Sequence, residues 1–226
     1  MVGLSAMVSG RVDRLELWEL DAGVAAVWAC TFSPDAWKLA HKIEAYSMTL
    51  DRVQATLAEP PDGTLELAFQ TIIRNRAQRG GIMAPGAGLI KMGDGRGVAS
   101  RWYPQTLATR IRLLSEYRHR VTARQGDGLA AYSRRAADPT VATFADPPYT
   151  AGGKRAGSRL YQHNEIDHGL LFSTAGVAAG PLLMTYDDCP EVQALAVQHG
   201  LKAERIPMKT GHHVLAKELV LTRTTP

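Results

Sequence analysis

The segment Asp146-Pro147-Pro148-Tyr149 holds the residue types that most directly indicate chemistry. It follows an apolar run, VATFA, that predicts a β-strand, and it precedes a segment rich in glycine. Two consecutive prolines remove two backbone N–H donors and stiffen the turn. The Asp146 carboxylate and the Pro147 carbonyl oxygen therefore become fixed hydrogen-bond acceptors, and an aromatic ring stands beside them.

These groups suit the exocyclic amine of a nucleobase, which is a poor nucleophile because its lone pair is conjugated into the ring. Two acceptors aimed at the amine hydrogens would localise that lone pair, and the Tyr149 ring would stack on a base flipped out of a duplex. The catalytic gain would come from positioning and from charge stabilisation as the nitrogen becomes cationic. The alternative without function is a proline-stiffened surface turn.

Basic residues concentrate in one part of this 226-residue chain, whose formal net charge is only +4. Between Thr71 and Gln125 lie 11 basic residues, ten of them arginine, against two acidic ones. A guanidinium group pairs bidentately with phosphate or with the groove edge of guanine. The stretch therefore predicts a segment that faces nucleic acid, the alternative being a solvated basic face.

The elements that must position these residues follow from the hydrophobic periodicity. A strand is predicted at residues 14–20, and helices are predicted at 22–29, within 35–58 and at 64–76, before a glycine-rich loop at 80–97. From Pro104 onward helices alternate with strands, which favours a largely parallel sheet covered on both faces. Two closing strands, at 202–207 and 214–222, are joined by a turn and must therefore be antiparallel.

Several protein classes are excluded by what the sequence lacks. No run of about 18 apolar residues is present, and the first residues do not resemble a signal peptide, so we expect a cytoplasmic protein with no membrane partner. Cys30 and Cys189 lie far apart without a CxxC pattern, so neither a disulfide framework nor a zinc site is expected. HExxH and GxSxG are absent too, which argues against a metal enzyme and a serine hydrolase.

The motif and its surroundings resemble the Dam-like adenine-specific DNA methyltransferases. Besides Asp146–Tyr149, the matching segments follow the family's order along the chain: Glu16–Asp21, Asn75–Arg76, Gly126–Asp127, Asp167–Leu171, Leu183–Pro190 and Lys217–Val220. The resemblance implies a site-specific enzyme that transfers methyl from S-adenosylmethionine to the exocyclic amine of adenine in duplex DNA. It also implies an α/β fold, a Rossmann-like methyltransferase sheet with an antiparallel C-terminal hairpin and a helical insertion.

The resemblance also assigns roles to individual residues. Asp146, Pro147, Pro148 and Tyr149 correspond to the catalytic motif, and the acids expected at the cofactor are Glu19 or Asp21 for the ribose, Asp127 for the adenine, and Asp146. The expected DNA contacts are Arg74, Asn75, Arg76, Arg79, Lys91, Arg96, Arg101, Lys154 and Arg155. Residues 1–34 and 105–226 would form the catalytic domain, and residues 35–104 would form the helical target-recognition insertion.

Two questions stay open at this point. The family's F-x-G-G-like cofactor loop would precede Gly3–Met7, where this chain begins. A misplaced start or fragment, a partner polypeptide that supplies the loop, and a degenerate DNA-binding copy without activity are the three interpretations. The acceptor is the second question, because cytosine's exocyclic amine, RNA and a protein amide are alternatives, although those enzymes more often carry Ser or Asn where Asp146 stands.

Overall fold

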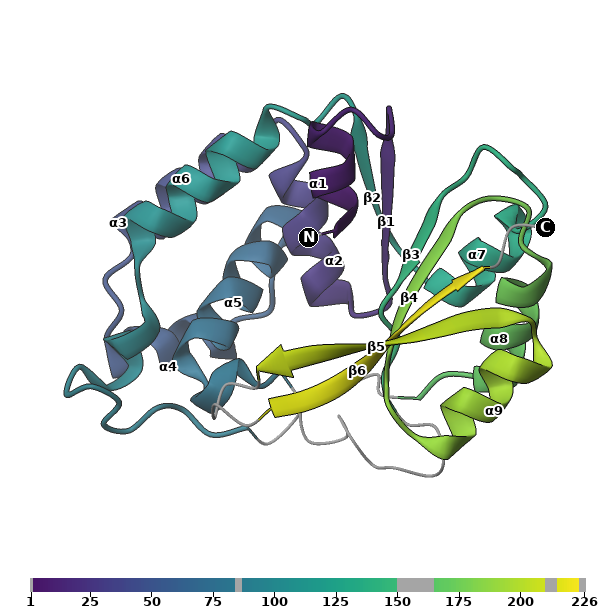
Figure 1. Ribbon diagram of the computed structural model, residues 1–226. Helices are drawn as coiled ribbons and strands as arrows, with labels where there is room; N and C mark the ends of the chain where they lie inside the picture. Colours follow the sequence, from purple (N-terminus) through teal and green to yellow (C-terminus); the bar gives the residue numbers. More distant parts are fainter. Residues whose placement is uncertain (1, 84–86, 150–164, 210–214, 224–226) are drawn as a thin grey trace. The chain divides into compact units, whose positions relative to one another are not determined.

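The computed structural model describes residues 2–83, 87–149, 165–209 and 215–223 of the chain (Figure 1). The chain folds into two compact units. We call the first, built chiefly from Ala6–Asp127, the helical unit, and the second, built chiefly from Gly128 onward, the sheet unit. This division follows packing rather than role, so the sequence-based division into catalytic and target-recognition parts stays a prediction.

The sheet unit contains a four-stranded sheet with the strand order β3-β4-β6-β5. Its strands are β3 (Thr143–Ala145), β4 (Leu182–Asp187), β5 (Leu201–Lys209) and β6 (Leu215–Arg223). Its helices are α7 (Gly128–Arg135), α8 (His168–Val177) and α9 (Pro190–Gln198). β3 and β4 are parallel, whereas β6 pairs antiparallel with both β4 and β5.

The core of the sheet unit lies against one face of this sheet. Along β4 the side chains of Leu182, Met184 and Tyr186 are buried, because alternate residues of a strand point to the same face. These three pack in one cluster with apolar residues of the unit's helices, among them Phe172 of α8. The intervening residues, Thr185 among them, are only partly buried. Within this unit the described helices therefore cover one face, and the expectation of two covered faces stays a prediction.

The helical unit contains two parallel strands and most of the helices. The strands are β1 (Leu15–Glu19) and β2 (Val121–Gln125). The helices are α2 (Ala22–Thr31), α3 (Ala36–Ala45), α4 (Leu50–Ala58), α5 (Gly63–Ala77) and α6 (Pro104–Ser115), with short 3-10 turns η1 (Arg79–Gly81) and η2 (Gly97–Arg101). A further helix, α1 (Val2–Val8), precedes β1. A second buried cluster, including Leu39, Phe69 and Ile111, holds α3, α5 and α6 together.

Helices α2 and α5 approach each other closely beside the end of β1. A Cβ atom at Gly23 would lie 2.5 Å from the Thr71 Oγ1 atom, so only glycine fits there without a shift of the Thr71 side chain or of α5. Asp21 caps α2, since its Oδ1 atom accepts a hydrogen bond of 2.9 Å from the Val24 N–H. The residues that follow β1 are therefore held in place by the packing of Gly23 against α5 and by the hydrogen bond of Asp21 to the start of α2.

The structure confirms the α/β class and the antiparallel closing hairpin of β5 and β6. The predicted parallel pairing is present for β1 with β2 and for β3 with β4. In the four-stranded sheet β3, β4 and β5 run in the same direction, and β6 alone is reversed and lies between β4 and β5. The described strands form two sheets rather than one. Among the described helices, none combines the length and apolarity that crossing a membrane requires.

Candidate functional site

The Asp146–Tyr149 motif begins where β3 ends. Ala145 of β3 is in register with Met184 of β4, so the next residue along each parallel strand, Asp146 and Thr185, lie side by side. Pro147 is buried, whereas Asp146 is exposed. The buried proline fixes the turn, and the carboxylate stands at the carboxyl end of a parallel strand pair, where open α/β sheets bind ligands.

The Asp146 carboxylate is held by two hydroxyl groups that donate to the same oxygen. Thr185 Oγ1 donates to Asp146 Oδ1 over 2.6 Å, and the Tyr149 hydroxyl donates to the same Oδ1 over 3.1 Å. Within the described part of the chain, no donor reaches the other oxygen, Oδ2. The described residues thus occupy one carboxylate oxygen and leave the second available to an incoming N–H group.

The Tyr149 ring rests on a second tyrosine from β4. Tyr149 and Tyr186 are stacked with ring centroids 5.4 Å apart and an angle of 26° between the planes. Tyr186 has no exposed surface, and its hydroxyl is hydrogen-bonded to His168 Nδ1 at the start of α8. Burial lowers the pKa of His168, which favours the neutral ring as the acceptor of that bond. Burial also raises the pKa of Tyr149 to about 12, so its hydroxyl stays protonated and can donate to Asp146.

Further carboxylates lie near Asp146 at this end of the sheet. Glu218 of β6 is in register with Asp187 of β4. Burial raises the pKa of Glu218, and the negative charges of Asp146 and Asp187 raise it further. This concentration of negative charge favours a ligand that is cationic or becomes cationic during a reaction. Among the described residues, no group of His, Cys, Asp or Glu side chains has the arrangement of a metal site.

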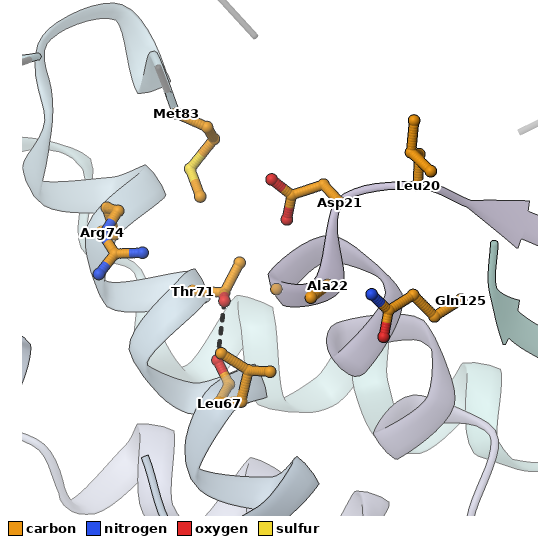
Figure 2. A pocket seen from close by; sticks show the side chains of 9 residues that line it. Leu20, Asp21, Ala22, Leu67, Thr71, Arg74, Met83 and Gln125 are labelled. Atoms are coloured by element: carbon orange, nitrogen blue, oxygen red, sulfur yellow. Dashed lines mark hydrogen bonds between the residues drawn. The ribbon is translucent and has the colours of Figure 1, made fainter. Parts of the chain in front are cut away.

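A cavity of about 390 Å³ lies in the helical unit, where β1 and β2 end (Figure 2). It is lined by Leu20, Asp21, Ala22, Gly23, Leu67, Thr71, Arg74, Met83 and Gln125. Figure 2 shows the Asp21 carboxylate and the Arg74 guanidinium on opposite sides of it. The lining thus includes a carboxylate, a guanidinium cation and an amide, together with the small residues Ala22 and Gly23.

Besides Asp146, three acids were predicted to bind the cofactor, and they have different surroundings. Asp21 lines the cavity, whereas Glu19 accepts a hydrogen bond of 2.9 Å from the Asp21 N–H and so fixes the backbone there. Asp127 is exposed and is not among the cavity's described lining residues, but Gln125 just before it is. The Gly126 N–H donates to the Glu19 carbonyl oxygen over 2.9 Å, so the ends of β1 and β2 are tied together beside the cavity. The cofactor contacts of Glu19, Asp21 and Asp127 stay predictions.

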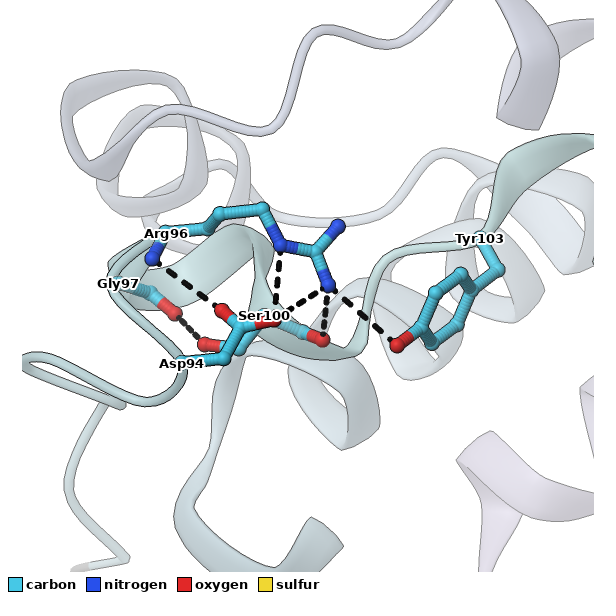
Figure 3. Close-up of polar contacts among 5 residues, drawn as sticks. All are labelled: Asp94, Arg96, Gly97, Ser100 and Tyr103. Atoms are coloured by element: carbon cyan, nitrogen blue, oxygen red, sulfur yellow. Dashed lines mark hydrogen bonds and ion pairs between the residues drawn. The ribbon is translucent and has the colours of Figure 1, made fainter.

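Three of the predicted DNA contacts make hydrogen bonds within the protein. Arg96 forms an ion pair of 2.6 Å with Asp94, and it also donates to the Ser100 carbonyl oxygen and the Tyr103 hydroxyl (Figure 3). Arg101 donates to the carbonyl oxygens of Asn75 and Gln78 over 3.1 and 3.3 Å, and therefore caps the end of α5. The Asn75 side-chain amide donates to the Gly81 carbonyl oxygen over 3.0 Å. The hydrogen bonds of these side chains stabilise the loop that follows α5.

Other predicted DNA contacts have no such partner. Arg79 and Lys91 are exposed, and neither side chain makes a hydrogen bond or ion pair within the described ranges. Burial lowers the pKa of Arg76, and the positive charges of Arg101 and Arg110 lower it further, so three guanidinium groups lie near one another. Such a group of cations favours an anion such as a phosphate. Lys154 and Arg155 lie outside the described residues.

Sequence reasoning did not identify Thr185, Tyr186 or Gln125 as residues of a site. Leu183–Pro190 was matched to a strand and turn of the family, but no role followed for its members. The available signal was the order of the strands, since a strand that pairs in parallel with β3 must place a residue beside Asp146. The partner strand could not be identified from the sequence.

Comparison with known proteins assigns neither a family nor a function to this chain. The sequence matches no family model, and no curated protein matches it. The function is therefore inferred from the residues and their geometry.

Proposed function

We propose that this chain is an S-adenosylmethionine-dependent DNA methyltransferase whose acceptor is the exocyclic amine of adenine in duplex DNA. The proposal rests on how the Asp146 carboxylate is hydrogen-bonded. Two hydroxyl groups hold Oδ1, and Oδ2 accepts no hydrogen bond from the described residues. A carboxylate oriented in this way, beside a proline carbonyl and an aromatic ring, suits a planar base that carries an amine.

In the proposed reaction, Asp146 Oδ2 and the Pro147 carbonyl oxygen accept the two amine hydrogens. This pairing localises the nitrogen lone pair, and Tyr149 holds the base by stacking. As the nitrogen forms its bond to the methyl carbon it becomes positively charged, and the nearby carboxylates of Asp146, Asp187 and Glu218 stabilise that charge. The nitrogen then loses one proton to solvent, which leaves a neutral methylamine.

S-adenosylmethionine, when bound, would supply the methyl group from its sulfonium, whose sulfur would keep the bonding electrons. The residues that line the cavity at the ends of β1 and β2 would hold the nucleoside part of this cofactor. Its Asp21 carboxylate can accept hydrogen bonds from ribose hydroxyl groups, and its Gln125 amide can pair with a base edge. Arg74 lies opposite Asp21 and offers a cation to the same ligand.

The exposed Arg79 and Lys91, with Arg76 beside two other arginines, support contact with the DNA backbone. Lys154 and Arg155, directly after the motif in the sequence, are proposed to extend this contact. An enzyme that acts on cellular DNA of a bacterium or phage would work in the cytoplasm.

The test is transfer of labelled methyl from S-adenosylmethionine to unmethylated duplex DNA by the purified 226-residue chain. Digestion of the product to nucleosides then identifies the acceptor. Label in methyladenine is expected, and label in methylcytosine would change the acceptor. If the chain binds DNA but transfers no label, also after an F-x-G-G-containing segment is added at its N-terminus, a non-catalytic DNA-binding protein becomes the better explanation.

A further inference from the structure

Thr185 is the closest polar partner of the proposed catalytic carboxylate. It belongs to β4, 39 residues after Asp146 in the sequence, and its hydroxyl lies 2.6 Å from Asp146 Oδ1. Thr185 is only partly buried, so water could satisfy its hydroxyl and burial does not force this bond. The bond therefore arises from the side-by-side placement of Asp146, directly after β3, and Thr185, within the parallel strand β4.

The two donors to Asp146 differ in how well they can keep their bond when a base binds. Tyr149 donates over the longer distance, 3.1 Å, and its ring is the one that must adjust to a stacked base. Thr185 is fixed within β4, whose neighbours Met184 and Tyr186 have no exposed surface. Thr185 can therefore keep its hydrogen bond to the carboxylate even if the Tyr149 side chain shifts when the base binds.

A carboxylate whose two oxygens are equivalent could rotate and offer either of them. Because Thr185 holds Oδ1, the amine encounters Oδ2, and the direction of the acceptor is fixed before the base arrives. Such fixed orientation lowers the cost of reorganisation in the transition state. It would not by itself change how tightly DNA or cofactor binds.

We infer that Thr185 is a positioning residue, which selects Oδ2 of Asp146 as the acceptor for the amine of the base. The expected effect on methyl transfer rests on the proposed function. The expected effect on the orientation of the Asp146 carboxylate does not. A residue of β4, outside the Asp146–Tyr149 motif, thus orients the carboxylate of that motif.

The test compares Thr185→Val, which keeps the shape but removes the donor, with Thr185→Ser, which keeps the donor. Thr222→Val is the matched control, because Thr222 lies on β6 of the same sheet and its side chain makes no hydrogen bond to the described residues. Thr185→Val is expected to lower kcat about 10- to 100-fold, with KM for S-adenosylmethionine and Kd for DNA changed less than about twofold. Thr185→Ser is expected to keep kcat within about threefold of the parent chain.

Non-additivity provides a sharper criterion. In an Asp146→Ala background, Thr185→Val is expected to have no further effect on residual transfer, because the group it positions is gone. An unchanged kcat in Thr185→Val, or an equal loss in Thr222→Val, would overturn the inference. Thermal unfolding of each variant shows whether a loss of kcat merely reflects a less stable fold.

A structural readout separates this inference from the proposed function. If the parent chain transfers no methyl group, crystal structures of the parent chain and of Thr185→Val still test the placement of the carboxylate. The Asp146 side chain is expected to rotate or to occupy two orientations in the variant. A carboxylate in the same single orientation in both structures would contradict the inference, whatever the chain's activity.

Discussion

The Asp146 region of the sheet unit and the basic segment of the helical unit hold their charged groups in different ways. Asp146 is held by Tyr149 of the same motif and by Thr185 of β4, and the described residues leave its second oxygen available. In the basic segment, the side chains of Arg96 and Arg101 are bound by the protein itself, whereas the Arg79 side chain makes no hydrogen bond or ion pair with the described residues. Charge alone therefore does not identify a binding residue, and the partners that the fold provides decide which cations can contact DNA.

The largest expected effect concerns the carboxylate. Asp146→Ala should lower methyl transfer by at least about 1,000-fold, because the amine loses the acceptor that localises its lone pair. DNA affinity should change little, since an exposed acid does not attract phosphates. Transfer is measured with labelled cofactor, and affinity with a labelled duplex. Loss of both properties together would instead indicate that Asp146 supports the fold.

The next effect distinguishes an arginine side chain that has no partner among the described residues from one that is paired within the protein. Arg79→Ala should weaken DNA binding about 3- to 10-fold and reduce the dependence of log Kd on log salt by about one phosphate contact. Arg96→Ala is the matched control, and it should change affinity less because Arg96 is paired with Asp94. Equal losses in both variants would show that the intramolecular ion pair opens when DNA binds.

Arg101→Ala should act on stability rather than directly on DNA binding. Its guanidinium donates to two carbonyl oxygens at the end of α5, and hydrogen bonds from a charged group to the backbone stabilise by about 1–3 kcal/mol. Urea unfolding should therefore show a lower midpoint, with Arg79→Ala as the comparison. A parent-like midpoint combined with weaker DNA binding would return Arg101 to the set of direct contacts.

The smallest effect is a pH dependence at Glu218. Its raised pKa means that the folded chain holds this proton more tightly than the unfolded chain, so stability falls as the pH rises from about 4.5 through the folded pKa. Glu218→Gln should remove this loss and raise Tm at pH 7 by about 1–3 °C, with a smaller change at pH 4. Glu204→Gln, at an exposed position of β5, serves as the control in calorimetric scans. A larger gain at pH 4 than at pH 7 would contradict the assignment.

The sequence allowed the motif and several elements to be predicted, because their signals are local. Asp146–Tyr149 is contiguous, and β5 and β6 are close in sequence, so their antiparallel pairing could be predicted. The bond from Thr185 to Asp146 could not, since it depends on which strand lies beside β3. The bonds of Arg101 could not either, because its acceptors are backbone carbonyl oxygens, which any residue supplies.

Position 23 sets a limit on how this protein can vary. A Cβ atom at position 23 would lie 2.5 Å from the Thr71 Oγ1 atom, so even alanine would displace the Thr71 side chain or α5. Gly23 itself lines the cavity, as do Thr71 and Arg74 of α5, so such a shift would reshape the cavity. In a library of variants, this position should therefore tolerate few substitutions, and those that survive should show altered ligand selectivity.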